Sequence, residues 1–330
     1  MARPRLLLTR RIPEPGFSLV HRAFAVKGGD EDRPLEREKL LADVRGVDAI
    51  LALLTEVIDG PVMDAAGPHL RVISNMAVGF DNVDVRAATA RGIVVTNTPG
   101  VLTEATADLT WALILSTARR VVEGDRMVRA GRFERWSPFM LLGRAVAGAT
   151  LGIVGMGRIG QAVAVRSSGF GMRVLYTRPG GPLPAEQVPP LARWEFRAEL
   201  DGLLGEADVV SLHVPLGAGT HHLIGARELA LMKPGSYLVN TSRGPVIDEA
   251  ALVESLRAGH LGGAGLDVYE SEPELAAGLA ELDNVILLPH LGSATVETRG
   301  RMAELAALNA IAVVRNEPAK HVVNPEVLRV

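Results

Sequence analysis

The sequence predicts an α/β protein of two domains, each built on an open parallel sheet with helices on both faces. The length sets the domain number, because 330 residues at roughly 150 residues per domain make two. The fold class follows from short β-rich runs that alternate with helix-compatible stretches, in two separate series along the chain. Parallel strands need such crossover connections, so we expect two doubly wound sheets.

The first series predicts four strands with helical stretches between them. The expected strands are residues 5–9, 48–53, 71–75 and 93–96, and the expected helical stretches are residues 35–44 and 61–66. The charged helical stretches and the apolar strands are typical of βαβ units in a sheet that is covered on both faces.

The second series predicts six strands: residues 150–154, 172–177, 207–213, 236–240, 263–268 and 284–288. Helical patterns separate them at residues 158–169, 227–232 and 248–258. Three more helical patterns belong to neither series, at residues 103–120, 121–130 and 294–316. Both series therefore give the same architecture, with extra helices between and after them.

Two segments with residues that interrupt regular secondary structure indicate where the chain passes between the domains. They are Thr98-Pro99-Gly100 and the segment at Pro289. A chain that passes twice has its first domain completed by its last helix. We therefore expect one domain from residues 1–99 and 290–330 and a second from residues 100–289, which includes an arm at residues 101–142.

Composition excludes several classes of protein. The balance of 35 basic and 38 acidic residues, a net charge of −3, argues against a nucleic-acid partner. No apolar run reaches the roughly 18 residues that a membrane span needs, so we expect a cytoplasmic protein without membrane partners. The absence of cysteine removes disulfides, thiolate nucleophiles and Cys-based metal centres. Redox chemistry would therefore need an organic cofactor, and the expected partner is a small molecule.

A glycine pattern after the strand at 150–154 indicates a dinucleotide site. Gly155, Gly157 and Gly160 follow that strand and open the next helix, which is the context that makes the pattern specific. The glycines allow a tight turn, close approach of a pyrophosphate and close helix packing, while the helix N-terminus offers amides, including those of Arg158 and Ile159. An ordinary strand-to-helix turn is the competing interpretation.

The end of the following strand bears on the choice of cofactor. NAD-binding sites place an acid there, whereas this chain has Thr177 and Arg178. Thr177 can donate a hydrogen bond to a ribose 2′-phosphate, and Arg178 can pair with it by charge. We expect NADPH to be preferred and NADH to be the alternative; the competing interpretation of Arg178 is an exposed loop arginine.

Three polar segments each begin at the end of a predicted strand. They contain Arg243, the pair Asp267 and Glu272, and His290. Ligands bind at the carboxyl edge of open α/β sheets, so these side chains are expected to converge. Reduction of a 2-keto acid needs a cation for the carboxylate, a proton donor for the carbonyl oxygen and a group that keeps the donor charged. Arginine, histidine and glutamate are suitable for those roles.

Together with the glycine pattern, four segments make the chain resemble the D-2-hydroxyacid dehydrogenase family over nearly its whole length: residues 231–235, 238–244, 265–268 and 289–293. Residues 77–84 and 97–108 most resemble the glyoxylate/hydroxypyruvate reductases of that family. The resemblance implies a Rossmann cofactor domain and a flavodoxin-like substrate domain, with a cleft between them. It also implies that Arg243 binds the substrate carboxylate and carbonyl, that His290 is the acid/base and that Glu272 pairs with His290.

The resemblance implies further site residues. The amides of Val78 and Gly79 would bind the carboxylate, and Ser293 and Trp136 would contribute to substrate binding. Further cofactor contacts are implied for Val214, Pro215, Thr241, Ser242, Asp267 and Gly292. The family's helical arm builds a dimer, so we expect a homodimer. Plain alternatives are a strand-end cap for Asp267, core and turn positions for Val214 and Pro215, and ordinary core or an intersubunit contact for Trp136.

The remaining histidines predict no metal site. His221 and His222 with His213 form the only grouping of interest, and neighbouring histidines on an extended chain point to opposite faces. No suitably spaced carboxylate completes a site.

The expected function is NADPH-dependent reduction of a short 2-keto acid, glyoxylate or hydroxypyruvate, to the D-2-hydroxy acid, with His290 as proton donor. Two alternatives stay open: a dehydrogenase for another 2-hydroxy acid, and a dinucleotide-sensing, corepressor-like binding protein. The second would bind cofactor without turning over any keto acid.

Overall fold

The computed structural model describes residues 3–190 and 192–329 and divides into two compact units. Unit 1 comprises the described residues of Met1–Leu102 and Ala294–Val330, and unit 2 comprises Thr103–Ser293. The sequence placed the two passages after residues 99 and 289, so both boundaries lie further along the chain than expected. At the second boundary the reason is local: the backbone amides of His290, Leu291 and Gly292 all donate to Asp267 of unit 2.

Unit 1 contains a five-stranded parallel sheet in the order β2-β1-β3-β4-β5. Its strands are β1 (Arg5–Leu8), β2 (Ala25–Gly28), β3 (Ala49–Ala52), β4 (Val72–Asn75) and β5 (Val94–Thr96). This is the strand order of flavodoxin-like sheets, whose switch point lies between β1 and β3.

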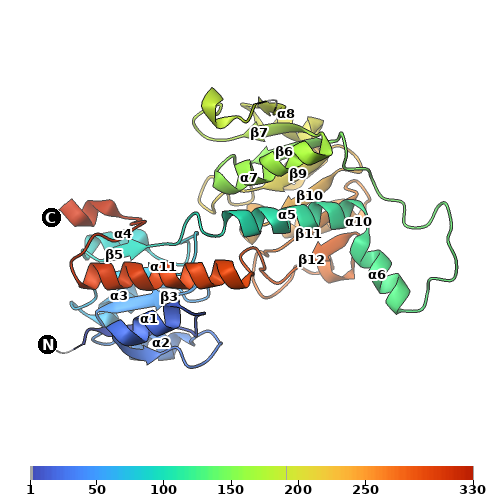
Figure 1. The fold of residues 1–330 in the computed structure, drawn as a ribbon. Helices are drawn as coiled ribbons and strands as arrows, with labels where there is room; N and C mark the ends of the chain where they lie inside the picture. The colour runs from blue at the N-terminus through green and yellow to red at the C-terminus, as the bar shows by residue number, and fades with distance from the viewer. Residues whose placement is uncertain (1–2, 191, 330) are drawn as a thin grey trace. The chain divides into compact units, whose positions relative to one another are not determined.

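Helices cover both faces of the unit 1 sheet (Figure 1). One face packs against α2 (Arg37–Asp43), α3 (Gly60–Ala66) and α4 (Val85–Ala90). The other face is covered by α1 (Gly16–Ala23) and α11 (Val296–Val314), and α11 contacts β3, β4 and β5. A short 3-10 helix, η5 (Pro325–Arg329), lies against β5. The helix that comes last in the sequence therefore completes the core of the unit that comes first.

Unit 2 contains a seven-stranded parallel sheet in the order β12-β11-β10-β9-β6-β7-β8. Its strands are β6 (Thr150–Val154), β7 (Arg173–Thr177), β8 (Trp194–Phe196), β9 (Val209–Leu212), β10 (Tyr237–Asn240), β11 (Gly263–Leu266) and β12 (Val285–Leu287). Counted from β6, this is the 3-2-1-4-5-6 order of dinucleotide-binding sheets with one strand added. The strand order reverses between β6 and β9.

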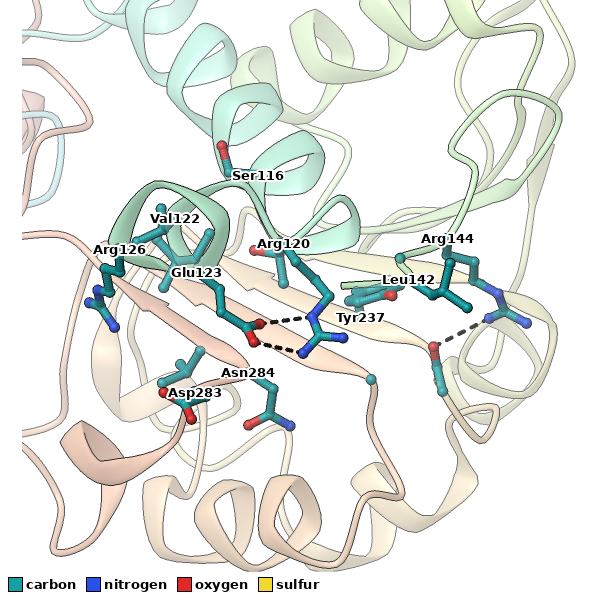
Figure 2. Close-up of a pocket in the computed structure, with 16 residues that line it drawn as sticks. Ser116, Arg120, Val122, Glu123, Arg126, Leu142, Arg144, Tyr237, Asp283 and Asn284 are labelled. Carbon is teal, nitrogen blue, oxygen red and sulfur yellow. Dashed lines mark hydrogen bonds and ion pairs between the residues drawn. The ribbon is translucent and has the colours of Figure 1, made fainter. Parts of the chain in front are cut away.

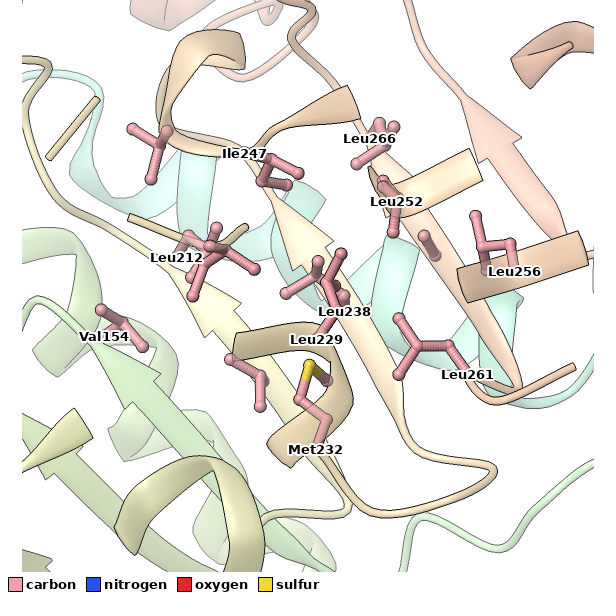
Figure 3. Packing of buried hydrophobic residues seen from close by; sticks show 14 of the residues in the cluster. Val154, Leu212, Leu229, Met232, Leu238, Ile247, Leu252, Leu256, Leu261 and Leu266 are labelled. Atoms are coloured by element: carbon pink, nitrogen blue, oxygen red, sulfur yellow. The ribbon is translucent and has the colours of Figure 1, made fainter. Parts of the chain in front are cut away.

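Two apolar layers sandwich this sheet. On one face α8 (Leu200–Glu206), α9 (Ala226–Leu231) and α10 (Glu249–Arg257) bury leucines against β9, β10 and β11 (Figure 3). On the other face α5 (Thr103–Ala118) and α7 (Arg158–Arg166) pack around Trp111, Leu113 and Val163. Helix α6 (Val121–Arg129) follows α5, and the short 3-10 helices are η1 (Ser167–Phe170), η2 (Ala185–Gln187), η3 (Gly244–Val246) and η4 (Leu279–Glu281).

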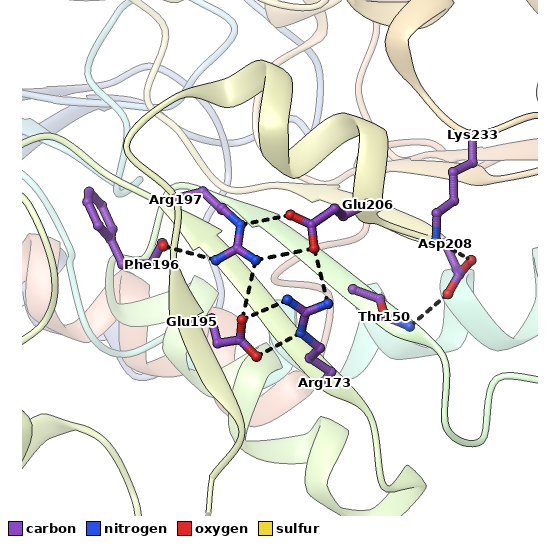
Figure 4. A network of polar contacts seen from close by, with 8 residues as sticks. All are labelled: Thr150, Arg173, Glu195, Phe196, Arg197, Glu206, Asp208 and Lys233. Atoms are coloured by element: carbon purple, nitrogen blue, oxygen red, sulfur yellow. Dashed lines mark hydrogen bonds and ion pairs between the residues drawn. The ribbon is translucent and has the colours of Figure 1, made fainter.

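The structure confirms the predicted class of two parallel-sheet α/β domains, and it adds elements that the sequence pattern missed. Strands β2 and β8 are sheet edges of four and three residues without a fully buried residue. An edge strand that is not buried on both faces lacks the apolar run by which central parallel strands are recognised. Strand β8 is also held by charge, since Arg173 and Arg197 pair with Glu195 and Glu206 (Figure 4). Helices α1, α4 and α8 were also missed. Among the described residues, no helix combines the length and hydropathy that a membrane crossing requires.

Candidate active site

The glycine turn between β6 and α7 has the geometry of a dinucleotide cradle. Gly155 has φ +99°, and a Cβ there would lie 2.5 Å from the carbonyl oxygen of His213. A Cβ at Gly160 would overlap the carbonyl of Gly155, whereas Gly157, the N-cap of α7, has no atom within 4 Å of its Cβ position. No side chain caps α7. The first and last glycines permit close packing, and the middle one leaves the helix N-terminus open, which fits a pyrophosphate.

Further cofactor candidates lie at the same edge. Gly155 donates its amide hydrogen to the carbonyl of Thr177 at 3.0 Å, and a side-chain carbon of Val214 lies 2.9 Å from the Cβ position of Gly155. Arg178 follows directly after β7, is half-buried and donates from Nε to the carbonyl of Pro179 at 3.2 Å. Arg158 and Pro215 are exposed, and Ile159 is half-buried. The second strand therefore ends beside the glycine turn, with a cation in place of an acid.

The structure brings His290 and Glu272 together. Nδ1 of His290 lies 2.9 Å from Oε2 of Glu272, and the other carboxylate oxygen accepts from the amide of Tyr269 at 3.1 Å. A carboxylate only accepts hydrogen bonds, so Nδ1 carries the proton and Nε2 is the nitrogen left for a ligand. Burial by itself raises the pKa of Glu272, but the hydrogen bond from His290 and the charges of His290 and Arg243 outweigh it and hold the pKa below its ordinary value. Glu272 is therefore a carboxylate fixed beside the imidazole.

Asp267 holds the backbone that carries His290. Its Oδ1 accepts from the amide of Leu291 at 2.6 Å, and its Oδ2 accepts from the amide of Gly292 at 2.7 Å. The side chain is buried, and this burial raises the pKa of Asp267 although both amides and His290 act against it. The structure therefore gives Asp267 the capping role that was its plain alternative; a contact with cofactor stays a prediction.

Arg243 lies on a turn that other residues hold rigidly. The buried Asn240 accepts from the amide and hydroxyl of Ser242 and donates to the carbonyl of Arg243 at 2.8 Å. Arg243 donates from Nη1 to the carbonyl of Ser242 at 2.8 Å. A Cβ at Gly244 would overlap the carbonyl group of Tyr269, so the Arg243 turn lies directly against the loop that leads to Glu272.

Helix α5 supplies threonines that the sequence analysis missed. Thr106 donates to the carbonyl of Gly292 at 3.0 Å, and Thr110 is hydrogen-bonded to Thr241 at 2.9 Å. Both α5 residues are buried, and together they connect the His290 segment with the Arg243 turn. Asn240 was missed as well. Its position at the end of a strand was the available signal, whereas the α5 threonines were hidden because an apolar helix pattern does not show which residues lie below a site.

In unit 1 the loop after β4 presents the amides of Val78 and Gly79. The carbonyl of Ala77 accepts from the amide of Thr98 at 2.8 Å, and the carbonyl of Val78 accepts from the side chain of Asn97 at 2.7 Å. In a trans peptide the N–H points away from the preceding carbonyl, so the amides of Val78 and Gly79 are directed away from the Asn97–Thr98 segment. Two neighbouring amides with the same fixed direction fit a carboxylate.

The two remaining predicted substrate residues, Ser293 and Trp136, lie in different segments of unit 2. Ser293 is half-buried and follows Gly292 on the Asp267-bound segment. Trp136 is 75% exposed in the long connection after α6, beyond the C-terminal end of α5, whereas Gly292 contacts Thr106 near its start. The substrate contact of Trp136 therefore stays a prediction.

The argument against a histidine cluster was wrong. The ring centroids of His221 and His222 lie 4.1 Å apart because the backbone is not extended there, with φ +48° at His222. Nε2 of His222 is hydrogen-bonded to Glu270, so a carboxylate completes the group. His213 is separate from it: its Nε2 lies 2.8 Å from the hydroxyl of Ser211, and removal from water lowers the pKa of His213 to about 3.

A hollow of about 500 Å³ in unit 2 is not part of this group (Figure 2). It lies between α6, the end of α5 and the amino-terminal ends of β10 and β12, and Arg120, Glu123 and Arg144 are among its lining residues. Arg243, Glu272 and His290 follow the carboxyl ends of their strands, which is the edge where α/β sheets bind ligands.

Comparisons with known proteins agree with this geometry. Residues 111–292 match the family model described as the NAD-binding domain of D-isomer specific 2-hydroxyacid dehydrogenases. The chain is a member of the D-isomer specific 2-hydroxyacid dehydrogenase family. A curated relative from Thermococcus gammatolerans, named glyoxylate reductase, is 51% identical over 99% of this chain and 98% of its own length.

Two solved structures show how far the likeness to other family members extends. A protein from Thermus thermophilus has a TM-score of 0.88 and 47% identity over 97% of this chain and 99% of its own. An NADPH-dependent glyoxylate/hydroxypyruvate reductase from Sinorhizobium meliloti, solved with NADP and malonate, has a TM-score of 0.85 and 37% identity over 98% and 97%. In the present chain, the match to the family's NAD-binding domain covers the glycine turn and extends through the three polar segments as far as Gly292.

Proposed function

We propose that this dehydrogenase reduces short 2-keto acids, glyoxylate and hydroxypyruvate, with NADPH as its preferred cofactor. The observation that carries the proposal is the His290–Glu272 pair at 2.9 Å, at the same sheet edge as Arg243 and the glycine turn. The names of the relatives support glyoxylate, and the Sinorhizobium meliloti enzyme adds hydroxypyruvate.

A bound nicotinamide cofactor supplies the hydride that reduces the carbonyl carbon to an alcohol. In this proposal the glycine turn and the α7 N-terminus hold the pyrophosphate of the cofactor. The rest of the cofactor is contacted by Val214, Pro215, Thr241 and Ser242. The residues that hold the substrate are Arg243, by a charge-assisted fork to the carboxylate, and the amides of Val78 and Gly79.

The proton comes from His290. Its Nε2 donates to the substrate oxygen as the alcohol forms, while Nδ1 keeps its hydrogen bond to Glu272. The carboxylate of Glu272, 2.9 Å from Nδ1, fixes the orientation of the imidazole during this transfer. Asp267 holds the backbone of Leu291 and Gly292, which makes it a positioning residue. In the oxidative direction neutral His290 takes the proton back.

The cofactor preference is supported by Thr177 and Arg178 at the end of β7. An acid there accepts from the ribose hydroxyls and repels a 2′-phosphate, and Arg178 reverses the sign of that field. The Sinorhizobium meliloti relative is NADPH-dependent, and a D-lactate dehydrogenase from Aquifex aeolicus, 29% identical, was solved with NAD and lactic acid. Both cofactors therefore belong in the assay.

We also propose that the enzyme is a homodimer built on residues 101–142. Trp136 is 75% exposed and Phe139 is 82% exposed, and Val128 and Leu142 add further exposed apolar area. Apolar patches of this kind on a folded chain mark interfaces. Light scattering at micromolar concentration should give twice the mass of the chain, and Phe139→Asp should give a monomer. A monomeric wild type would refute the assignment.

One assay tests the function as a whole. Purified protein is mixed with NADPH or NADH and glyoxylate, hydroxypyruvate, pyruvate or a bulkier keto acid, and the absorbance of the reduced nicotinamide is followed. Glyoxylate and hydroxypyruvate with NADPH should give the highest kcat/KM. A preference for pyruvate would assign a different 2-hydroxy acid, and cofactor binding without turnover of any acid would favour the corepressor-like alternative.

A further inference from the structure

We propose that His221, His222 and Glu270 form a binding site for a divalent transition-metal ion, with Zn²⁺ as the best match. The site lies outside the residues assigned to hydride and proton transfer, and nothing in the proposed function requires it. It would serve as a clamp on the loops that carry the catalytic groups.

The three side chains already face one another. One ligand atom of each lies within 4.8 Å of one ligand atom of every other, so a single ion can reach all three after small rotamer changes. The two imidazole rings lie 4.1 Å apart at 33°. His222 and Glu270 are in direct hydrogen-bond contact, and the ion would replace the shared proton between them.

The backbone and the surrounding contacts fix two of the three ligands. The amide of His222 donates to the carbonyl of Pro245 at 2.8 Å, and φ +48° turns its side chain toward His221. The Oε2 atom of Glu270 accepts from the amide of Glu249 at 3.2 Å, which leaves Oε1 for His222 or an ion. In known metal sites, hydrogen bonds from neighbouring groups orient the metal-binding side chains in the same manner.

The donor set selects the class of metal. Two imidazoles and one carboxylate suit Zn²⁺ and its neighbours, whereas Mg²⁺ and Ca²⁺ prefer oxygen donors throughout. Three protein ligands on the surface leave coordination positions for water. The nearby carboxylate of Glu249, which accepts from the amide of Glu270 at 2.7 Å, adds negative charge that favours a cation.

The position of the site gives it a consequence. The two histidines come from the loop after β9, and Glu270 comes from the loop after β11. The 3-10 helix η3 contacts both loops: the carbonyl of Pro245 accepts from the amide of His222, and Gly244 packs against Tyr269 and Glu270. These are the segments that carry Val214, Arg243 and Glu272. A bound ion would therefore stabilise the folded protein by mass action and hold the Arg243 and Glu272 loops together.

The test uses full-length, tag-free protein that has been treated with EDTA and dialysed, with ZnCl₂ alone as the probe. Calorimetric titration should give one ion per chain, and the ion should raise Tm by a few degrees. His221→Ala removes an exposed ligand and should lower Zn²⁺ affinity at least tenfold, as should Glu270→Gln. His69→Ala removes an exposed histidine elsewhere and should leave affinity unchanged. Circular dichroism checks that the variants are folded, and MgCl₂ should not compete.

Three results would overturn the proposal: no binding of Zn²⁺ at concentrations up to about 100 μM, equal affinity in wild type and His221→Ala, or equal loss in His69→Ala and His221→Ala. Because binding and Tm are measured without substrate, failure of this proposal is distinguishable from failure of the proposed reductase activity.

Discussion

Replacing Gly244 by alanine should separate Arg243 from the His290–Glu272 pair. An added Cβ at this position would overlap the carbonyl carbon and oxygen of Tyr269 and crowd the amide of Glu270. Non-bonded carbon atoms prefer a separation of about 3.5–4.0 Å, so the two backbones must move apart by about 1 Å or more. Such overpacking typically costs about 1–3 kcal/mol of the free energy of unfolding.

The catalytic effect should exceed the loss of stability. A displacement of about 1 Å between catalytic groups can lower a rate by roughly 100-fold, so kcat/KM for glyoxylate should fall by about that factor in Gly244→Ala. The affinity for NADPH, measured by fluorescence titration, should change little because the glycine turn follows β6, which β9 separates from β10 in the sheet. Gly169→Ala is the matched control, since its Cβ meets no atom within 4 Å. Near-native kcat/KM and Tm in Gly244→Ala would contradict this expectation.

Four more variants test single groups. Glu272→Gln should lower kcat/KM for glyoxylate, because a neutral amide replaces the carboxylate that accepts from Nδ1 of His290; near-native kcat/KM would contradict the pairing. Arg243→Lys should lower kcat/KM about 10–100-fold with little change in NADPH affinity, as one charge-assisted bond of roughly 1.5–3 kcal/mol is lost, and near-native efficiency would refute the fork. Arg178→Asp should lower the ratio of NADPH affinity to NADH affinity by about 10–100-fold, with little effect on kcat. Equal binding of both cofactors by the wild type would make Arg178 a plain surface residue. His213 has a folded-state pKa of about 3 against 6.5 for the free side chain, so the unfolded chain binds the extra proton between those values and stability falls as pH drops below about 6.5. His213→Gln should flatten that fall in urea unfolding series at pH 7 and pH 5, and identical pH dependence would count against it.

The fold class and the sheet edge of the proposed site follow from the sequence without the structure. Alternation of apolar runs with helix patterns is a local property, so the central strands β6, β9 and β10 were predictable. The end of a parallel strand is also local, and all such ends share one edge. That rule led from single residues to Arg243, Glu272 and His290 at the same edge, although the distance between Glu272 and His290 needed the structure.

Features that depend on contacts between distant segments came from the three-dimensional structure alone. Strands β2 and β8 exist because a neighbouring strand offers hydrogen bonds, and their short, partly exposed sequences carry no periodic signal. Asp267 accepts from the amides of Leu291 and Gly292, which lie 24 and 25 residues further along the chain. Thr106 and Thr110 reach Gly292 and Thr241 because α5 packs across β10 to β12. The histidine pair was misjudged for the same reason. Residue order fixes that His221 and His222 are neighbours, whereas their relative direction depends on a backbone angle that the contact with Pro245 and Glu270 sets.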